Sequence, residues 1–153
     1  MSARPYAPFM LTDLFLRMPG HYIRRAQQVS SAYFTEELAD SELTSVQMVA
    51  LVAIADNPGI DATRLSEIID FDRATIGGVV DRLERKGLIQ RVVNKQDKRS
   101  KVMRATPAGK ALLDVSLPHV MRVQERLLAP LSKEDQDTFL RLMQAIIAGE
   151  NAV

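Results

Sequence analysis

Apolar residues recur at helical spacing over most of the chain, and long stripes of them lie near both ends. The first stripe lies between Pro19 and Leu38. It consists of Tyr22, Ala26, Val29 and Tyr33. The period of 3.6 residues predicts a helix, and proline suits the first helical turn. We expect residues 9–18 to form a separate short helix or an arm, because a proline inside one continuous helix would kink it.

The last third of the chain carries two further helical patterns. Thr106 followed by Pro107 is typical of a cap and a first-turn proline, and it predicts a helix that extends to about Leu128. Ser132 and Asp135 are spaced as in a capping box and predict the start of a final helix. The expected buried face of that helix consists of Phe139, Leu140, Met143, Ile146 and Ile147.

Shorter helical patterns, separated by turn signals, occupy the middle of the chain. A helix capped by Thr44 or Ser45 is expected to end at residues 57–59, which read Asn-Pro-Gly. Its expected buried face consists of Val46, Val49, Ala50, Ala53 and Ile54. Asp61 then caps a short helix, and a basic helix follows over about residues 73–86. The short helix is expected to bury Leu65, Ile68 and Ile69. Two short helices with a tight connection indicate a helix-turn-helix.

The helical spacing ends at Gly87, a residue type that often terminates helices. Residues 88–93 and 101–105 have strand propensity, and residues 94–100 between them are wholly polar. This pattern predicts a β-hairpin, or wing, attached directly to the basic helix. The expected fold class is therefore mainly α with a small β-hairpin: a winged helix-turn-helix flanked by N-terminal and C-terminal dimerisation helices.

We expect one integrated domain with three parts. Residues 1–42 are the N-terminal arm and dimerisation helix, residues 43–106 the winged helix-turn-helix, and residues 107–153 the C-terminal dimerisation helices. The terminal helices are too apolar for isolated arms, so we expect them to pair with those of a second copy in a two-fold homodimer. The alternative is that they fold back on their own domain.

Composition narrows the class of protein. The chain has 153 residues, of which 46% are hydrophobic and 25% charged, as in a typical globular domain. It has no cysteine, which excludes disulfide scaffolds, cysteine–zinc sites and thiol chemistry. No basic N-terminus precedes an apolar segment, and no apolar run reaches the ~18 residues that a membrane span needs. We therefore expect a soluble, cytoplasmic protein.

Positive charge is concentrated in one segment. Residues 73–104 contain ten Lys or Arg and three Asp or Glu, a net charge of +7, whereas the rest of the chain carries −6. A run of charge is often only a solvated face. Here the acidic remainder of the chain favours a localised surface that binds a polyanion.

Little in the sequence suits catalysis. Only His21 and His119 are present, about a hundred positions apart. No histidine–carboxylate cluster has the spacing of metal ligands, and no nucleophile motif or phosphate-binding glycine loop occurs. We therefore predict no enzyme activity, no catalytic residues, no metal and no cofactor. The other rival to a DNA-binding protein is an effector-binding or protein-interaction dimer that does not bind DNA.

Four motifs in the centre of the chain resemble those of one family. They are Leu43-Thr44-x-x-Gln47, Val80-Asp81-Arg82-Leu83-Glu84-Arg85-Lys86-Gly87-Leu88-Ile89-x-Arg91, Asn94-x-x-Asp97-Lys98-Arg99 and Thr106-Pro107-x-Gly109. In this order and spacing, over about residues 43–109, they resemble the multiple-antibiotic-resistance regulator (MarR) family of winged-helix repressors. Lys98 replaces the usual middle arginine of the wing, which keeps the charge.

The basic helix supplies the first candidate DNA contacts. Its N-terminal half, including Arg73, Ala74 and Thr75, is expected to meet base edges in the major groove. Arg73 can donate to guanine, and Thr75 can contact a thymine methyl group or a phosphate. Arg82 lies further along the helix, where phosphate contact is the expected role.

Two adjacent glycines interrupt this helix. Gly77 and Gly78 stand where members of the resembled family often place a Ser, Thr or Arg that faces DNA. Within a helix each glycine reduces stability by roughly 0.5–1 kcal/mol relative to alanine. Their compensation is either close approach of the helix backbone to DNA or tight packing against the preceding helix.

The wing supplies the second set of DNA contacts. Arg99 at the hairpin tip is expected to enter the minor groove, and Asp97 is expected to hold its guanidinium group extended, as the family resemblance also implies. Lys95, Lys98 and Lys101 neutralise phosphates. A two-fold dimer with these contacts should bind double-stranded DNA at an inverted repeat with half-sites ~10 bp apart. The alternative is a mobile charged loop.

Small aromatic or lipophilic acids are the effectors that the family resemblance implies, bound between the dimerisation helices and the winged domain. In this chain the aromatic-rich first long helix supplies Tyr22 and Tyr33, and His21, Arg24 and Arg25 can meet an anion. A phenolic acid, or an acyl conjugate of one, would suit these residues and would release a repressor from its operator. The alternative is that the tyrosines belong to the dimer core and the arginines are solvated.

Overall fold

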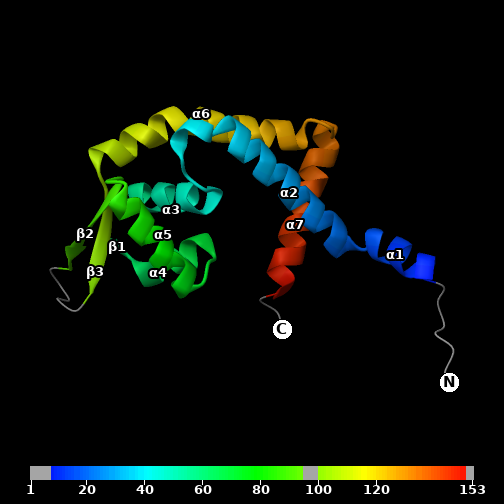
Figure 1. The fold of residues 1–153 in the computed structure, drawn as a ribbon, viewed down its shortest axis with the longest axis horizontal. Helices are drawn as coiled ribbons and strands as arrows, with labels where there is room; N and C mark the ends of the chain where they lie inside the picture. Colours follow the sequence, from blue (N-terminus) through cyan, green and yellow to red (C-terminus); the bar gives the residue numbers. More distant parts are fainter. Residues whose placement is uncertain (1–7, 95–99, 151–153) are drawn as a thin grey trace, which may run out of the picture. The chain divides into compact units, whose positions relative to one another are not determined.

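The structure is a computed structural model that describes residues 8–94 and 100–150 (Figure 1). In chain order its elements are α1 (Pro8–Leu16), α2 (Pro19–Glu37), η1 (Ala39–Ser41), α3 (Ser45–Asp56), β1 (Ile60–Asp61), α4 (Ala62–Ile69), α5 (Arg73–Arg85), β2 (Ile89–Val93), β3 (Lys101–Ala105), α6 (Pro107–Leu128) and α7 (Lys133–Glu150). They form two compact units. The winged unit spans Phe34–Met121, and the terminal unit contains the described residues up to Tyr33 and from Arg122 onward. The three-part division of the chain stays a prediction.

The winged unit has an apolar core built by α3, α4, α5 and the sheet. Its largest fully buried side chains are Leu51, Ile54, Leu65, Ile76, Leu83, Ile89 and Met103. The helices are capped as predicted: Thr44 Oγ1 accepts from the Gln47 amide at 3.3 Å, and Asp61 Oδ1 accepts from the Arg64 amide at 2.8 Å. Asp70, with φ of 55°, ends α4, and α5 begins at Arg73, which confirms the helix-turn-helix.

Two positions that were expected to be buried in these helices are exposed. Val49 on α3 is 47% exposed, and Ile68 on α4 is 42% exposed. The buried face of α3 instead includes Gln47 and Met48, because α3 packs against α4, α5 and β3 together. Val49 and Ile68 line an apolar groove of about 590 Å³, which Leu117 of α6 also lines. The buried-face prediction was therefore wrong at these two positions.

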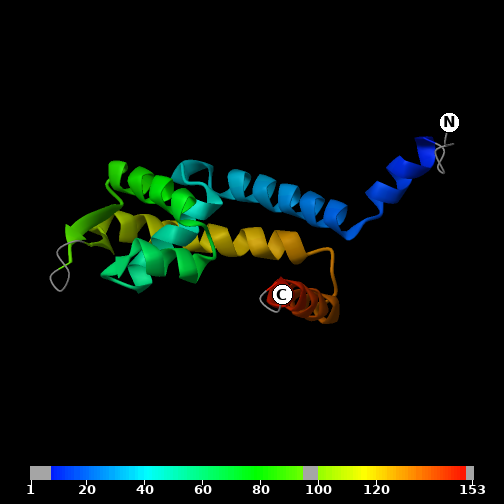
Figure 2. The same cartoon turned by 90° about the horizontal axis from the view of Figure 1, so that it is seen from below.

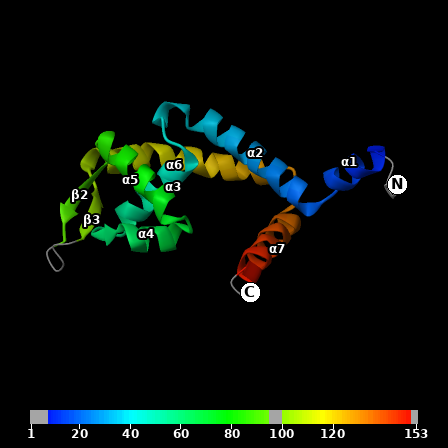
Figure 3. The same cartoon turned by 60° about the horizontal axis from the view of Figure 1, so that its bottom comes forward.

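A three-stranded antiparallel sheet with the order β1-β3-β2 completes the winged unit. Met103 of the central strand β3 pairs with Ile60 on one side and with Arg91 on the other. Figure 3 shows β2 and β3 side by side as the predicted hairpin. The sequence did not reveal β1, because a strand of two residues is too short to show alternation of apolar and polar positions.

The junction between the hairpin and α6 is held by Thr106. Its hydroxyl donates to the Gly87 carbonyl at 2.6 Å and accepts from the Gly109 amide at 3.1 Å, so it caps α6 as predicted. A Cβ atom at Gly109 would lie 2.1 Å from the Leu88 carbonyl oxygen. Only glycine therefore fits at position 109 without a shift of the backbone.

The terminal unit exposes much of its apolar surface in the single chain. Figure 2 shows a bend between α1 and α2, so the two helices are separate, as predicted. The expected buried face of α7 is not buried: the exposed fraction is 36% at Phe139, 48% at Leu140, 60% at Ile146 and 55% at Ile147. Physically, too few neighbouring side chains of the same chain cover this helix. Across residues 8–94 and 100–150, no helix has both the length and the apolar character to cross a membrane.

Candidate DNA-binding surface

Helix α5 begins with a well-formed cap. Asp72 Oδ1 accepts from the Thr75 amide at 2.9 Å, and Asp72 Oδ2 accepts from the Thr75 hydroxyl at 2.5 Å. The hydroxyl bond and then the amide bond hold the pKa of the Asp72 carboxyl below its usual value. A carboxylate at this position stabilises the helix N-terminus.

All predicted DNA-contacting residues on α5 lie on its exposed face. They are Arg73, Ala74, Thr75, Gly77, Gly78 and Arg82. The opposite face is buried and consists of Ile76, Val79, Val80 and Leu83. The side of α5 that carries these residues therefore faces solvent and does not contribute to the core of the winged unit.

Arg73 is already oriented by a neighbouring helix. Its guanidinium group donates to Thr63 Oγ1 on α4 at 2.6 Å, and both residues are exposed. A guanidinium has five N–H donors, so this contact leaves others available for a base or a phosphate. The role of Thr63 could not be predicted from local pattern, because the two residues are ten positions apart on different helices.

Arg91 on β2 is bound to α5 by both acids of that helix. Its Nε donates to Glu84 Oε2 at 2.8 Å, and its Nη2 donates to the same oxygen. Its Nη1 lies 2.8 Å from Asp81 Oδ1. The side-chain hydrogen bond from Arg91 holds the pKa of Glu84 below its usual value. We call this set of three residues the Arg91 clamp. It ties the first wing strand to the recognition helix, a role that the sequence analysis missed.

The Arg91 clamp determines how much of the positive charge of this segment stays unpaired. Arg91 balances one of the two negative charges of Glu84 and Asp81, so these acids offset the other basic residues of α5 and β3 by one charge only. Arg82 and Lys101 are exposed, and neither forms an ion pair with another residue in the described part of the chain. The free positive charge therefore lies on the exposed side of the helix and at the start of β3.

A hollow of about 340 Å³ lies between α4, α5 and the wing. Its lining includes Thr63, Arg73, Gly77, Arg91 and Lys101. The hollow thus combines cationic side chains, a hydroxyl and the bare backbone of a glycine. Four predicted wing contacts, Lys95, Asp97, Lys98 and Arg99, lie outside the described residues, and their roles stay predictions.

Of the predicted effector residues, the structure brings together the near neighbours His21, Tyr22 and Arg24, and an Arg24 guanidinium nitrogen lies 3.4 Å from His21 Nδ1. The rings of His21 and Tyr22 meet edge to face with centroids 5.9 Å apart. Tyr22 lines a pocket of about 300 Å³ with Phe139, and His21 lines a separate pocket with Phe15 and Arg24. Arg25 donates to Gln28 Oε1 at 2.8 Å. The Arg126 guanidinium stacks 4.1 Å from the centroid of the Tyr33 ring. Neither of these pockets is lined by Arg25 or Tyr33.

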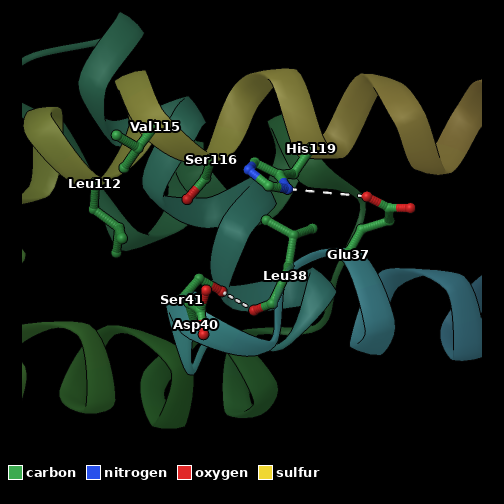
Figure 4. A pocket seen from close by; sticks show the side chains of 8 residues that line it. All are labelled: Glu37, Leu38, Asp40, Ser41, Leu112, Val115, Ser116 and His119. Atoms are coloured by element: carbon green, nitrogen blue, oxygen red, sulfur yellow. Dashed lines mark hydrogen bonds and ion pairs between the residues drawn. The ribbon is translucent and has the colours of Figure 1, made fainter.

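A smaller pocket of about 170 Å³ lies within the winged unit, between η1 with the end of α2 and helix α6 (Figure 4). Ser116 is 4% exposed and lines it, as do Asp40 and Ser41. At its edge, His119 Nδ1 lies 3.9 Å from Glu37 Oε2. In the described part of the chain, no three His, Cys, Asp or Glu side chains form a group that could hold a metal ion. The sequence pattern did not predict a role for His119 at a pocket.

Helices α3 to α5 followed by the β2–β3 wing define a winged helix-turn-helix protein, which confirms the predicted fold class with one strand added. The MarR family model matches residues 43–101. The HTH-type transcriptional repressor NicR of Pseudomonas putida is 33% identical over 134 residues, which cover 87% of this chain and 85% of NicR. The chain therefore belongs to the MarR family of transcriptional regulators.

Two solved structures show the same fold over most of the chain. BpsR of Bordetella bronchiseptica, whose DNA binding is described as regulated by 6-hydroxynicotinic acid, matches with a TM-score of 0.82 and 26% identity over 94% of this chain and 97% of BpsR. The transcriptional repressor CouR, bound to a 23-mer DNA duplex, matches with a TM-score of 0.80 and 27% identity over 87% of this chain and 94% of CouR.

Proposed function

We propose that this protein is a ligand-responsive transcriptional repressor that binds an inverted-repeat operator as a homodimer and is released by a small aromatic or phenolic acid, or by an acyl conjugate of one. The observation that carries this proposal is the exposed face of α5, with Arg73, Thr75 and Arg82 on it, beside the cationic hollow at the wing. That surface combines a groove-sized helix with exposed positive charge, which is what duplex DNA requires.

DNA recognition is divided between helix and wing. The N-terminal half of α5 enters the major groove, where Arg73 donates to guanine while Thr63 keeps it oriented. Lys101, with Lys95 and Lys98, neutralises phosphates, and Arg99 reaches into the minor groove, held by Asp97. CouR, of the same fold, is described as bound to a 23-mer DNA duplex, which supports duplex DNA as the partner of this fold.

Dimerisation uses the terminal helices. Phe15, Tyr22 and Ile146 are each at least 60% exposed in the single chain, which is costly for large apolar side chains unless a partner covers them. A second copy supplies the same apolar faces through a two-fold axis. Dimerisation also sets the distance between the two recognition helices, and therefore the spacing of the operator half-sites.

The effector is an aromatic acid held along α2, from His21 to Tyr33. His21, Tyr22, Arg25 and Tyr33 combine aromatic surface with groups that pair with a carboxylate. The description of BpsR names 6-hydroxynicotinic acid, an aromatic acid, which supports this class for a relative of the same fold. To release the operator, the effector must bind the DNA-incompetent state more tightly than the competent one.

Selection of bound DNA from a random duplex pool tests the proposal, first without additions and then with benzoate, 4-hydroxybenzoate or 6-hydroxynicotinate. We expect enrichment of an inverted repeat with half-sites ~10 bp apart, and lower recovery with at least one acid. If the purified protein enriches no duplex even in dilute buffer, the proposal is wrong, and a dimer that does not bind DNA becomes the better reading.

Arg99→Ala tests the wing separately. Loss of the minor-groove arginine should weaken binding to the selected operator at least tenfold, while circular dichroism and sedimentation show an unchanged fold and dimer. The measurement is a fluorescence anisotropy titration. Binding as tight as that of the parent would end the minor-groove role of the wing.

A further inference from the structure

The backbone conformation of the recognition helix does not require glycine at its two adjacent glycine positions. Gly77 and Gly78 lie inside α5, and the glycines with positive φ are Gly59 and Gly87 instead. An alanine would adopt the same helical backbone more readily, since glycine loses more conformational freedom on folding. Helix formation therefore opposes glycine at both positions.

Packing gives no reason either. A Cβ atom built at Gly77 or Gly78 meets no heavy atom within 4 Å. The expectation of tight packing against the preceding helix is therefore wrong. Gly109 shows what such a requirement looks like, because its Cβ would lie 2.1 Å from a backbone oxygen.

The surroundings of the two glycines are cationic and open to solvent. Gly77 lines the hollow between α4, α5 and the wing, together with Arg73 and Lys101. Gly78 lies one turn before Arg82, which is exposed. A methyl group at either position would project from the helix into the space that a bound polyanion must enter.

We propose that Gly77 and Gly78 form a specificity-determining contact, at which the operator approaches the backbone of α5 too closely for any side chain. The inference rests on the proposed DNA binding and deepens it. Side chains that read bases are absent at these two positions, so Arg73 and Thr75 carry the base readout from α5. The glycines set how deeply the helix sits in the groove.

Two measurements on Gly77→Ala, Gly78→Ala and the double variant test this inference. Each alanine should lower the unfolding equilibrium constant about two- to fivefold and raise Tm by about 1–4 °C, because helix propensity improves. The same variants should bind the selected operator at least tenfold more weakly, because the added methyl group blocks close approach. Opposite signs for stability and affinity are the expected signature.

Gly149→Ala is the matched control. Gly149 is also a helical glycine whose Cβ would meet no atom within 4 Å, but it lies on α7. Because it lies in the last turn of α7, it should gain less stability than the α5 variants. It should keep the parent's affinity for the operator, with sedimentation showing an unchanged dimer. A Gly77→Ala, Gly78→Ala double variant that binds as tightly as the parent would overturn the inference, and so would a loss of stability, which would indicate a packing role. Failure of the parent itself to bind any duplex would instead overturn the proposed function.

Discussion

The winged unit and the terminal unit use their apolar residues differently. In the winged unit, Leu51, Leu65 and Leu83 are fully buried. In the terminal unit, Val123 is the buried residue among those whose exposure is described, whereas Phe15 and Ile146 are 62% and 60% exposed. The winged unit thus has its own apolar core, whereas the helices of the terminal unit have apolar side chains that their own unit does not cover. Hydrophobic periodicity predicts helices equally well in both units, but it does not say which chain covers them.

Gly109→Ala should give the largest effect, because it acts on the self-sufficient core. The new Cβ would overlap the Leu88 carbonyl oxygen and force the hairpin away from α6. We expect a loss of about 3 kcal/mol in the free energy of unfolding, at the upper end of the range for overpacking. Urea denaturation measures it, with Gly149→Ala as the control that should gain stability. If Gly109→Ala leaves the free energy of unfolding unchanged, the Leu88 carbonyl and α6 are not packed as closely as this contact requires.

Ile146→Asp should separate the two copies. If the α7 face is covered by a second chain, a carboxylate there is buried without a partner, which weakens dimerisation at least hundredfold. Sedimentation over a concentration series measures the dissociation constant of the dimer.

Ala145→Asp is the control for this experiment. It introduces the same side chain one position earlier, on roughly the opposite side of α7 from the apolar residues. It should leave the dimer intact. If both variants dimerise as tightly as the parent, the apolar face of α7 is not the interface.

Arg91→Met should weaken operator binding about tenfold with a smaller effect on stability. The variant frees the wing strand from α5 and leaves Glu84 and Asp81 as unpaired negative charges beside the DNA surface. Glu84→Gln breaks the same contact while removing a negative charge. If Glu84→Gln binds as tightly as the parent, charge rather than the geometry of the Arg91 clamp controls binding.

The pH dependence of stability offers a second readout of the clamp. The folded pKa of Glu84 lies below its usual value of 4.5 because the side-chain hydrogen bond from Arg91 favours the carboxylate. The clamp therefore stabilises the fold above about that pH, and its contribution is lost as the pH falls through the lower folded value. The stability difference between parent and Arg91→Met should shrink between pH ~6 and ~3. An unchanged difference would show that Arg91 stabilises the fold by packing alone.

Much of the winged unit could be predicted from the sequence because its signals are local. The caps at Thr44, Asp61 and Thr106 and the strand at residues 101–105 lie where the pattern predicts them. The Arg91 clamp could not be predicted, since it joins a helix to a strand through side chains seven and ten positions away. Local pattern also gave no reason for the exposure of Val49 and Ile68, because exposure depends on which neighbours cover a helix.

The sequence predicted which face of the recognition helix is exposed in the candidate site, but not the side-chain contacts within the site. The sequence placed Arg73, Thr75 and Arg82 on one exposed face, and the structure agrees. It did not show that Thr63 orients Arg73, nor that the glycines lack any packing role. Residues that act through a partner on another element carry no local signal.

The salt dependence of operator affinity tests the central claim most directly. Fluorescence anisotropy of the selected duplex, titrated with the parent protein at several salt concentrations, gives the slope of log affinity against log salt. A dimer that neutralises at least ~6 phosphates should lose about a thousandfold in affinity between 50 and 200 mM salt. Affinity that does not change with salt, or no binding even in dilute buffer, would contradict a DNA-binding role for the positive surface of α5 and the wing.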